Sequence, residues 1–143
     1  LLRREMPALD ALGYITAQFL SAMLDVLVVH AMFDLALLQS SSNYRGGVNL
    51  YLSEGIATLG LLMMILSVRQ LSLLAVAPAV GLYISAGYWF TSSTSFANPA
   101  VTVARGFTDS FTGIDPAFIL PFIGAQLIAA VAAMLLMRFL LDD

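Results

Sequence analysis

Four stretches of about 20 or more mostly apolar residues constrain this chain more than any other feature of its sequence. They cover residues 12–33, 48–68, 71–90 and 117–141, and none contains more than one charged side chain. The hydrocarbon core of a bilayer is about 30 Å thick, so a helix needs about 20 apolar residues to cross it. The sequence therefore predicts an all-α membrane protein with four transmembrane helices.

The composition agrees with a surface that faces lipid. Apolar side chains make up 60% of the 143 residues and charged ones only 10%, whereas soluble domains are about a quarter charged. The net charge is −3 and every basic residue is an arginine. No basic face is therefore available to neutralise phosphates, and we expect no binding of nucleic acid.

Several kinds of active site are also excluded. The chain has no cysteine and one histidine, so neither a disulfide framework nor a metal site of thiolate or zinc type is expected. We find no nucleophile–histidine–carboxylate arrangement, no glycine-rich phosphate loop and no paired carboxylates. The sequence therefore predicts neither an enzyme nor a cofactor.

A polar stretch between the third and fourth spans has its own pattern. Residues 91–115 are too many for a turn and too polar to span, but 99–107 reads as a short helix with Asn98 as N-cap and Pro99 at the first helical position. A helix that enters the membrane and stops there leaves N–H groups unpaired, so it must line a cavity. Asn98 suits this place because its side-chain oxygen caps the helix while its NH₂ group faces the lumen.

The fold class that we predict is thus four transmembrane helices plus one re-entrant half-helix. Taken alone, Asn-Pro-Ala is most often a plain helix start in a loop, because short patterns match by accident. The surrounding spans favour the re-entrant interpretation.

The arginines predict the orientation of the spans. Four of them share one side of the membrane if the spans alternate: Arg3, Arg4, Arg69 and Arg138. The opposite side holds Arg45 and Arg105. By the positive-inside rule, the side that holds the four arginines is cytoplasmic. We expect a multi-pass protein of the inner, or plasma, membrane.

Two spans resemble each other. Tyr-Ile-Thr-Ala-Gln-Phe-Leu-Ser-Ala at 14–22 matches Phe-Ile-Gly-Ala-Gln-Leu-Ile-Ala-Ala at 122–130, which makes Gln18 equivalent to Gln126. The two spans cross the membrane in opposite directions, so the repeat is inverted and predicts a solute pathway on a pseudo-two-fold axis. A partner of the short helix is then expected upstream of Leu1.

Ser-Phe-Ala-Asn-Pro-Ala-Val-Thr at 95–102, within an inverted repeat and after the Gly-Leu-Tyr run at 81–83, resembles the aquaporin, or major intrinsic protein, family. The resemblance implies that 1–143 is a single aquaporin-like domain that lacks the family's first two spans and first Asn-Pro-Ala motif. It further implies one pore for water and small neutral solutes in each protomer of a homotetramer. Glu54 resembles the family's buried glutamate, which accepts hydrogen bonds from the pore loop.

The sequence departs from the family at the pore constriction. Where most relatives have an arginine, this chain has Val101, and the next arginine, Arg105, lies one helical turn further on. Arg105 either reaches back to the constriction or snorkels to the outer surface. The resemblance implies that seven residues line the pore: Ala86, Ser95, Asn98, Pro99, Ala100, Val101 and Arg105.

A small and uncharged constriction, together with the segments 30–34 and 88–94, resembles a bacterial subgroup implicated in passing arsenite, which is an uncharged trihydroxide. We therefore expect a passive channel for glycerol-like or arsenite-like solutes and water. A water-selective aquaporin and a non-conducting truncated protein or assembly partner are the alternatives. Asp25 is expected to be a packing defect or a lumen-facing acid rather than a proton relay, and His30 to reach the interface.

Overall fold

The computed structural model describes residues 6–141, in which every regular element is a helix and no strand is present, as the sequence predicts. The elements follow one another as α1 (Ala8–Met32), α2 (Val48–Leu71), η1 (Leu73–Ala75), α3 (Val76–Phe90), α4 (Pro99–Ala104), η2 (Arg105–Phe107), η3 (Pro116–Phe118) and α5 (Ile119–Leu141). Four segments are long and apolar enough to cross a membrane: Ala8–Met32, Val48–Leu71, Leu73–Phe90 and Pro116–Leu140.

The helix ends lie close to the predicted spans and have local causes. α1 begins directly after Pro7, four residues before the predicted start. α2 continues to Leu71 and ends where Ser72 takes an extended backbone (φ −160°, ψ 123°), so the turn into the third span falls at Ser72. Arg3 and Arg4, on which the predicted orientation partly depends, lie outside the described residues.

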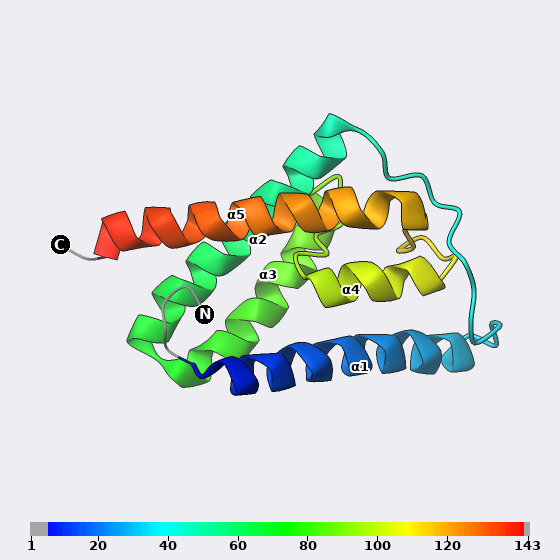
Figure 1. Cartoon of the computed structure of the whole chain (residues 1–143), viewed down its shortest axis with the longest axis horizontal. Coiled ribbons are helices and arrows are strands. Elements are labelled where there is room, and N and C mark those ends of the chain that lie inside the picture. The colour runs from blue at the N-terminus through cyan, green and yellow to red at the C-terminus, as the bar shows by residue number, and fades with distance from the viewer. Residues whose placement is uncertain (1–5, 142–143) are drawn as a thin grey trace.

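The short helix α4 lies between two long ones. α2 and α5 form the most extensive helix pair, while α4 contacts α1 on one side and α5 on the other (Figure 1). α3 packs mainly on α2. We use "half-helix" below for the continuous segment made of α4 and η2, residues 99–107.

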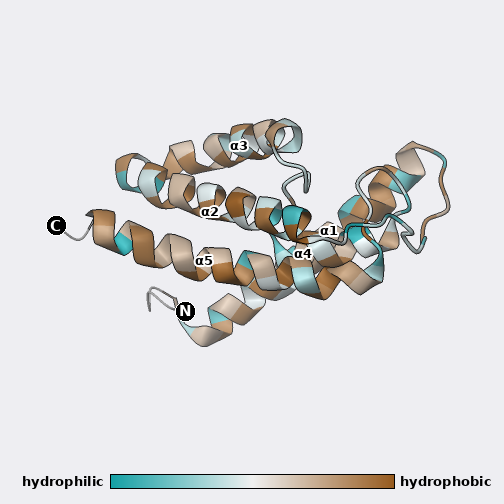
Figure 2. Cartoon of the chain, turned by 90° about the horizontal axis from the view of Figure 1, so that it is seen from above, coloured by the Kyte–Doolittle hydropathy of each residue, from teal (hydrophilic) through white to brown (hydrophobic). Residues whose placement is uncertain are grey.

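The buried apolar core is small and sits beside the half-helix. In the part of the chain that the structure describes, its one cluster of buried residues consists of Phe96, Ile114 and Phe122, from the loop before the half-helix, the loop after it and the start of α5. Many large hydrophobic residues of the long helices are exposed, and hydrophobic positions run along these helices (Figure 2). In a bilayer, where lipid tails are as apolar as leucine, such exposed residues carry no desolvation cost.

Candidate functional site

The half-helix begins with a capped turn. Asn98 is the N-cap (φ −155°, ψ 127°), its Oδ1 accepts a hydrogen bond from the backbone N–H of Ala100 at 2.8 Å, and Pro99 occupies the first helical position. The capping oxygen is thus committed to the backbone. The Nδ2 group points the other way and donates to Oε1 of Gln18 on α1 at 3.3 Å. The side chain of Asn98 therefore presents a donor toward α1.

The loop before the half-helix is strained. Thr94, Ser95 and Ala97 have φ values of 64°, 51° and 50°, which residues with a side chain rarely adopt. Each such residue costs about 1–3 kcal/mol, so surrounding contacts must hold the conformation in place.

Glu54 supplies those contacts. Its side chain is fully buried, and its carboxylate accepts hydrogen bonds from the backbone N–H of Ala97 at 2.5 Å and of Phe96 at 3.3 Å. The Nε2 group of Gln126 donates to the same carboxylate at 2.8 Å. Glu54 therefore faces protein and accepts hydrogen bonds from the loop before the half-helix.

Gln126 extends this network into the half-helix. Its Nε2 group also donates to Oγ1 of Thr102 at 2.8 Å, and the Thr102 hydroxyl donates to the backbone oxygen of Asn98 at 2.9 Å. One amide thus connects α2, α5 and the half-helix. The sequence signals Gln126 only through the repeat, which marks it as equivalent to Gln18.

Arg45, in the loop between α1 and α2, is a buried residue that sequence reasoning assigned only to a loop. Its guanidinium donates to the backbone oxygens of Gly113 (2.6 Å), Ser93 (3.0 Å) and Phe111 (3.0 Å), and it lies 5.0 Å from the centre of the Phe96 ring. Desolvation by burial lowers the pKa of Arg45 below its ordinary value. Arg45 therefore joins the loops on both sides of the half-helix.

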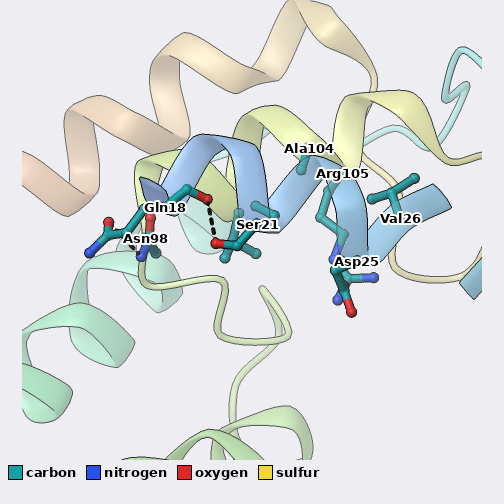
Figure 3. A pocket seen from close by; sticks show the side chains of 9 residues that line it. Gln18, Ser21, Asp25, Val26, Asn98, Ala104 and Arg105 are labelled. Atoms are coloured by element: carbon teal, nitrogen blue, oxygen red, sulfur yellow. Dashed lines mark hydrogen bonds between the residues drawn. The ribbon is translucent and has the colours of Figure 1, made fainter. Parts of the chain in front are cut away.

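A cavity of about 290 Å³ lies between α1 and the half-helix (Figure 3). Asn98, Val101 and Arg105 line it from the half-helix, and Gln18, Ser21 and Asp25 are among the residues that line it from α1. Both sets repeat at three or four residues, so each forms one face of its helix. Of the two expectations for Asp25, the structure shows the carboxylate at a cavity wall rather than in a packed interface.

The other predicted pore residues do not line this cavity. Ala100 is buried and Pro99 half-buried within the half-helix, and Ala86 lies exposed on α3. Ser95 is buried against α3, where a Cβ added to Gly87 would lie 2.7 Å from its hydroxyl oxygen. The structure thus brings together three of the seven residues.

Arg105 is held at the cavity wall by a chain of hydroxyl groups. Its Nη1 group donates to Oγ1 of Thr112, which is 3.2 Å from the Ser110 hydroxyl, and that group is 3.0 Å from the Thr108 hydroxyl. The last link joins Thr108 to Nε2 of His30 at 2.8 Å. His30 is only 1% exposed, so the expectation that it reaches the interface is wrong, because hydrogen bonds hold the ring inside the protein.

A comparison with characterised proteins gives a relative for nearly the whole chain. Over 133 residues the chain is 48% identical to aquaglyceroporin AqpS of Rhizobium meliloti (strain 1021), a match that covers 93% of this chain and 57% of the relative. The chain thus spans little more than half of that protein's length. No protein-family model and no solved structure matches the chain.

The relative is an aquaglyceroporin, which is a channel and not an enzyme, in agreement with the class that the sequence predicts. With its four apolar helices, the chain is multi-pass and resides in a membrane. The identity over almost all of its residues confirms the resemblance that the motif and the inverted repeat indicated: the chain is homologous to part of a protein of the aquaporin, or major intrinsic protein, family.

Proposed function

We propose that this chain forms part of a passive channel for small uncharged solutes, such as glycerol or arsenite, and for water. The observation that carries the proposal is the cavity in which Asn98, Val101 and Arg105 share one wall. Asn98 offers one amide N–H group there, because its oxygen is committed to the cap and its other N–H group donates to Gln18. A solute hydroxyl can accept such a hydrogen bond as it passes.

The lining suits a solute that is part polar and part hydrocarbon. The polar groups of Asn98 and Arg105 alternate with the apolar side chains of Val101 and Ala104 on the same wall. Val101 in place of a fixed cation widens the path and removes five N–H donors. A polyol or an uncharged trihydroxide then places hydroxyls on the donors and its remaining surface on the aliphatic groups.

The intact assembly is also a proposal, because the relative is longer than this chain. We propose that a second Asn-Pro-Ala half-helix meets the one described here, that the protein is a homotetramer, and that it resides in the plasma membrane. The inverted repeat of α1 and α5 supports the first of these.

The test is solute flux into proteoliposomes that contain the full-length protein, followed by light scattering. Asn98→Ala should lower glycerol flux about tenfold, as expected for one lost hydrogen bond at the solute, with membrane insertion unchanged. Asn49→Ala is the matched control, because Asn49 is exposed at the start of α2 and outside the cavity. Equal flux in Asn98→Ala and the unchanged protein would refute the pore assignment.

Arg105 at the cavity wall favours a second candidate, a water-selective pore in which Arg105 replaces the missing constriction arginine. Two variants separate the candidates. If Val101 sets the selectivity, Val101→Arg should reduce glycerol or arsenite uptake far more than water flow. If Arg105 supplies the charge, Arg105→Ala should abolish selectivity, and Val101→Arg should reduce both fluxes together through repulsion between like charges.

A further inference from the structure

Asp25 is a carboxylate within the membrane-spanning helix α1, seven residues before its end at Met32. On insertion scales such a group costs up to about 2.5–3.5 kcal/mol, the value at the centre of a helix. Asp25 follows Gln18 and Ser21 on one face of α1, and that face lines the cavity (Figure 3). Within residues 6–141, its oxygens accept no hydrogen bond and form no direct ion pair. The carboxylate therefore needs compensation from another group on the cavity wall or from what enters the cavity.

Arg105 is the group of opposite charge on the same cavity. Among the described residues that line it, Asp25 is the anion and Arg105 the cation. A guanidinium has five N–H donors, and the hydrogen bond from Nη1 to Thr112 uses one of them. The other donors remain for the cavity, and the fixed charges of the two walls cancel.

The position of Arg105 is determined by contacts outside the cavity. Thr112 belongs to the hydroxyl chain that ends at buried His30, whose Nδ1 group is 3.0 Å from the backbone oxygen of Leu37. A carbonyl oxygen only accepts, so the Nδ1–H group donates to it and fixes the ring. The guanidinium is thus held on the half-helix wall instead of following a solute.

We propose that Asp25 and Arg105 act as a charge-balanced pair that selects uncharged, polyhydroxylated solutes in this cavity. The inference rests on the proposed channel function. A solute hydroxyl donates to the Asp25 carboxylate, and another accepts from the Arg105 guanidinium. An ion gains nothing from the pair, because the charge that attracts it is opposed by one that repels it.

The test uses the full-length protein in proteoliposomes and four variants: Asp25→Asn, Arg105→Gln, the double variant, and Asp10→Asn. Glycerol flux, water flux and the reversal potential in a KCl gradient are measured on each. Asp10→Asn is the matched control, because Asp10 is an exposed carboxylate in the first turn of α1, outside the cavity.

Each single variant should lower the ratio of glycerol to water flux about tenfold, the value of one charge-assisted hydrogen bond. Removal of the anion in Asp25→Asn should make the residual ion leak anion-selective, and removal of the cation in Arg105→Gln should make it cation-selective. The double variant should lose glycerol preference and show no ion selectivity, while the control matches the unchanged protein.

Two results would overturn the inference. One is an unchanged flux ratio and reversal potential in both single variants. The other is an equal loss of both fluxes with no change in reversal potential, which would give the pair a structural role only. If the unchanged protein conducts neither glycerol nor water, the proposed channel function fails instead. Where Asp25→Asn or Arg105→Gln does not insert, Asp25→Glu and Arg105→Lys replace them. Both keep the charge balance, so the ion leak should stay without ion selectivity, as in the unchanged protein, and an ion-selective leak in either variant would overturn the inference.

Discussion

The two sides of the half-helix differ although the helices that flank it carry the same repeat. On the α5 side, Gln126 is 2% exposed and donates to both Glu54 and Thr102. On the α1 side, the equivalent Gln18 is exposed, and its Oε1 accepts a hydrogen bond from Asn98 across the edge of a cavity. We call these the closed side and the open side.

Gln126 and Gln18 occupy equivalent positions of the repeat, but their roles differ because their neighbours differ. α2 packs along α5 and brings a carboxylate to Gln126, so the amide becomes part of a buried network. Among the described residues, no carboxylate bonds to Gln18. The same side chain thus stabilises the protein on the closed side and lines the cavity on the open side.

Removing the carboxylate of the closed side should have the largest effect. Glu54→Leu leaves the N–H groups of Phe96, Ala97 and Gln126 without their acceptor, at about 1–3 kcal/mol for each buried donor. We expect misfolded protein, detected as loss of the monodisperse species in detergent. Glu54→Gln is the control: it keeps the size and one acceptor oxygen, so its melting temperature should lie between those of Glu54→Leu and the unchanged protein. A Glu54→Leu variant as stable as the unchanged protein would contradict the network.

A substitution of Arg45 tests whether the loops before and after the half-helix contribute to stability as the Glu54 network does. Arg45→Met removes a buried cation and leaves three carbonyl oxygens without their donor. The cost of desolvating the guanidinium disappears as well, so we expect a net loss of about 2–4 kcal/mol. Thermal unfolding in detergent is the measurement. Arg45→Lys keeps the charge but not the three-way geometry and should recover only part of the loss; full recovery would show that charge alone matters.

Much of this arrangement follows from local rules that a sequence displays. The lengths of the apolar stretches gave the four spans, and the cap preference of asparagine followed by proline gave the start of the half-helix at Asn98. Glu54 was expected from the family resemblance and from the cost of a carboxylate in lipid. Each of these depends on one segment or on the surrounding membrane.

What the sequence did not give depends on long-range contacts. The three acceptors of Arg45 lie 48 to 68 residues away along the chain, and no local pattern distinguishes this arginine from an exposed one. The position of Arg105 depends on where the loop after the half-helix places Thr112. Ala86 does not line the cavity, because α3 packs mainly on α2, and its place in a pore stays a prediction.

Equivalent substitutions of Gln126 and Gln18 compare the stability of the closed and open sides directly. Gln126→Leu removes two buried hydrogen bonds and should lower the free energy of unfolding by about 1–3 kcal/mol. Gln18→Leu removes one long, exposed bond and should change it by less than about 0.5 kcal/mol. Both are measured by thermal unfolding in the same detergent. Equal losses would mean that the two sides do not differ in stability.

The smallest effect on stability is expected at Asp109, which joins the loop after the half-helix to the loop between α1 and α2. The Asp109 carboxylate accepts hydrogen bonds from the backbone N–H of Ser42 at 2.7 Å and from its hydroxyl at 3.0 Å. These bonds lower the pKa of Asp109 below its ordinary value. A carboxylate with a lowered pKa in the folded state stabilises the protein at pH values above its ordinary pKa, about 3.9, and this contribution is lost as the pH falls through the lowered value.

Melting temperatures of the unchanged protein and of Asp109→Asn should therefore differ at pH 6 and converge toward pH 3. The difference should be small, because the group is fully exposed and screened by solvent. Glu54→Gln serves as the comparison from the closed side, since its loss of stability should persist at pH 6 at high salt, whereas that of Asp109→Asn should shrink as salt screens an exposed charge. If the difference in melting temperature between Asp109→Asn and the unchanged protein does not depend on pH, the hydrogen bonds with Ser42 depend on the shape of the side chain and not on its charge.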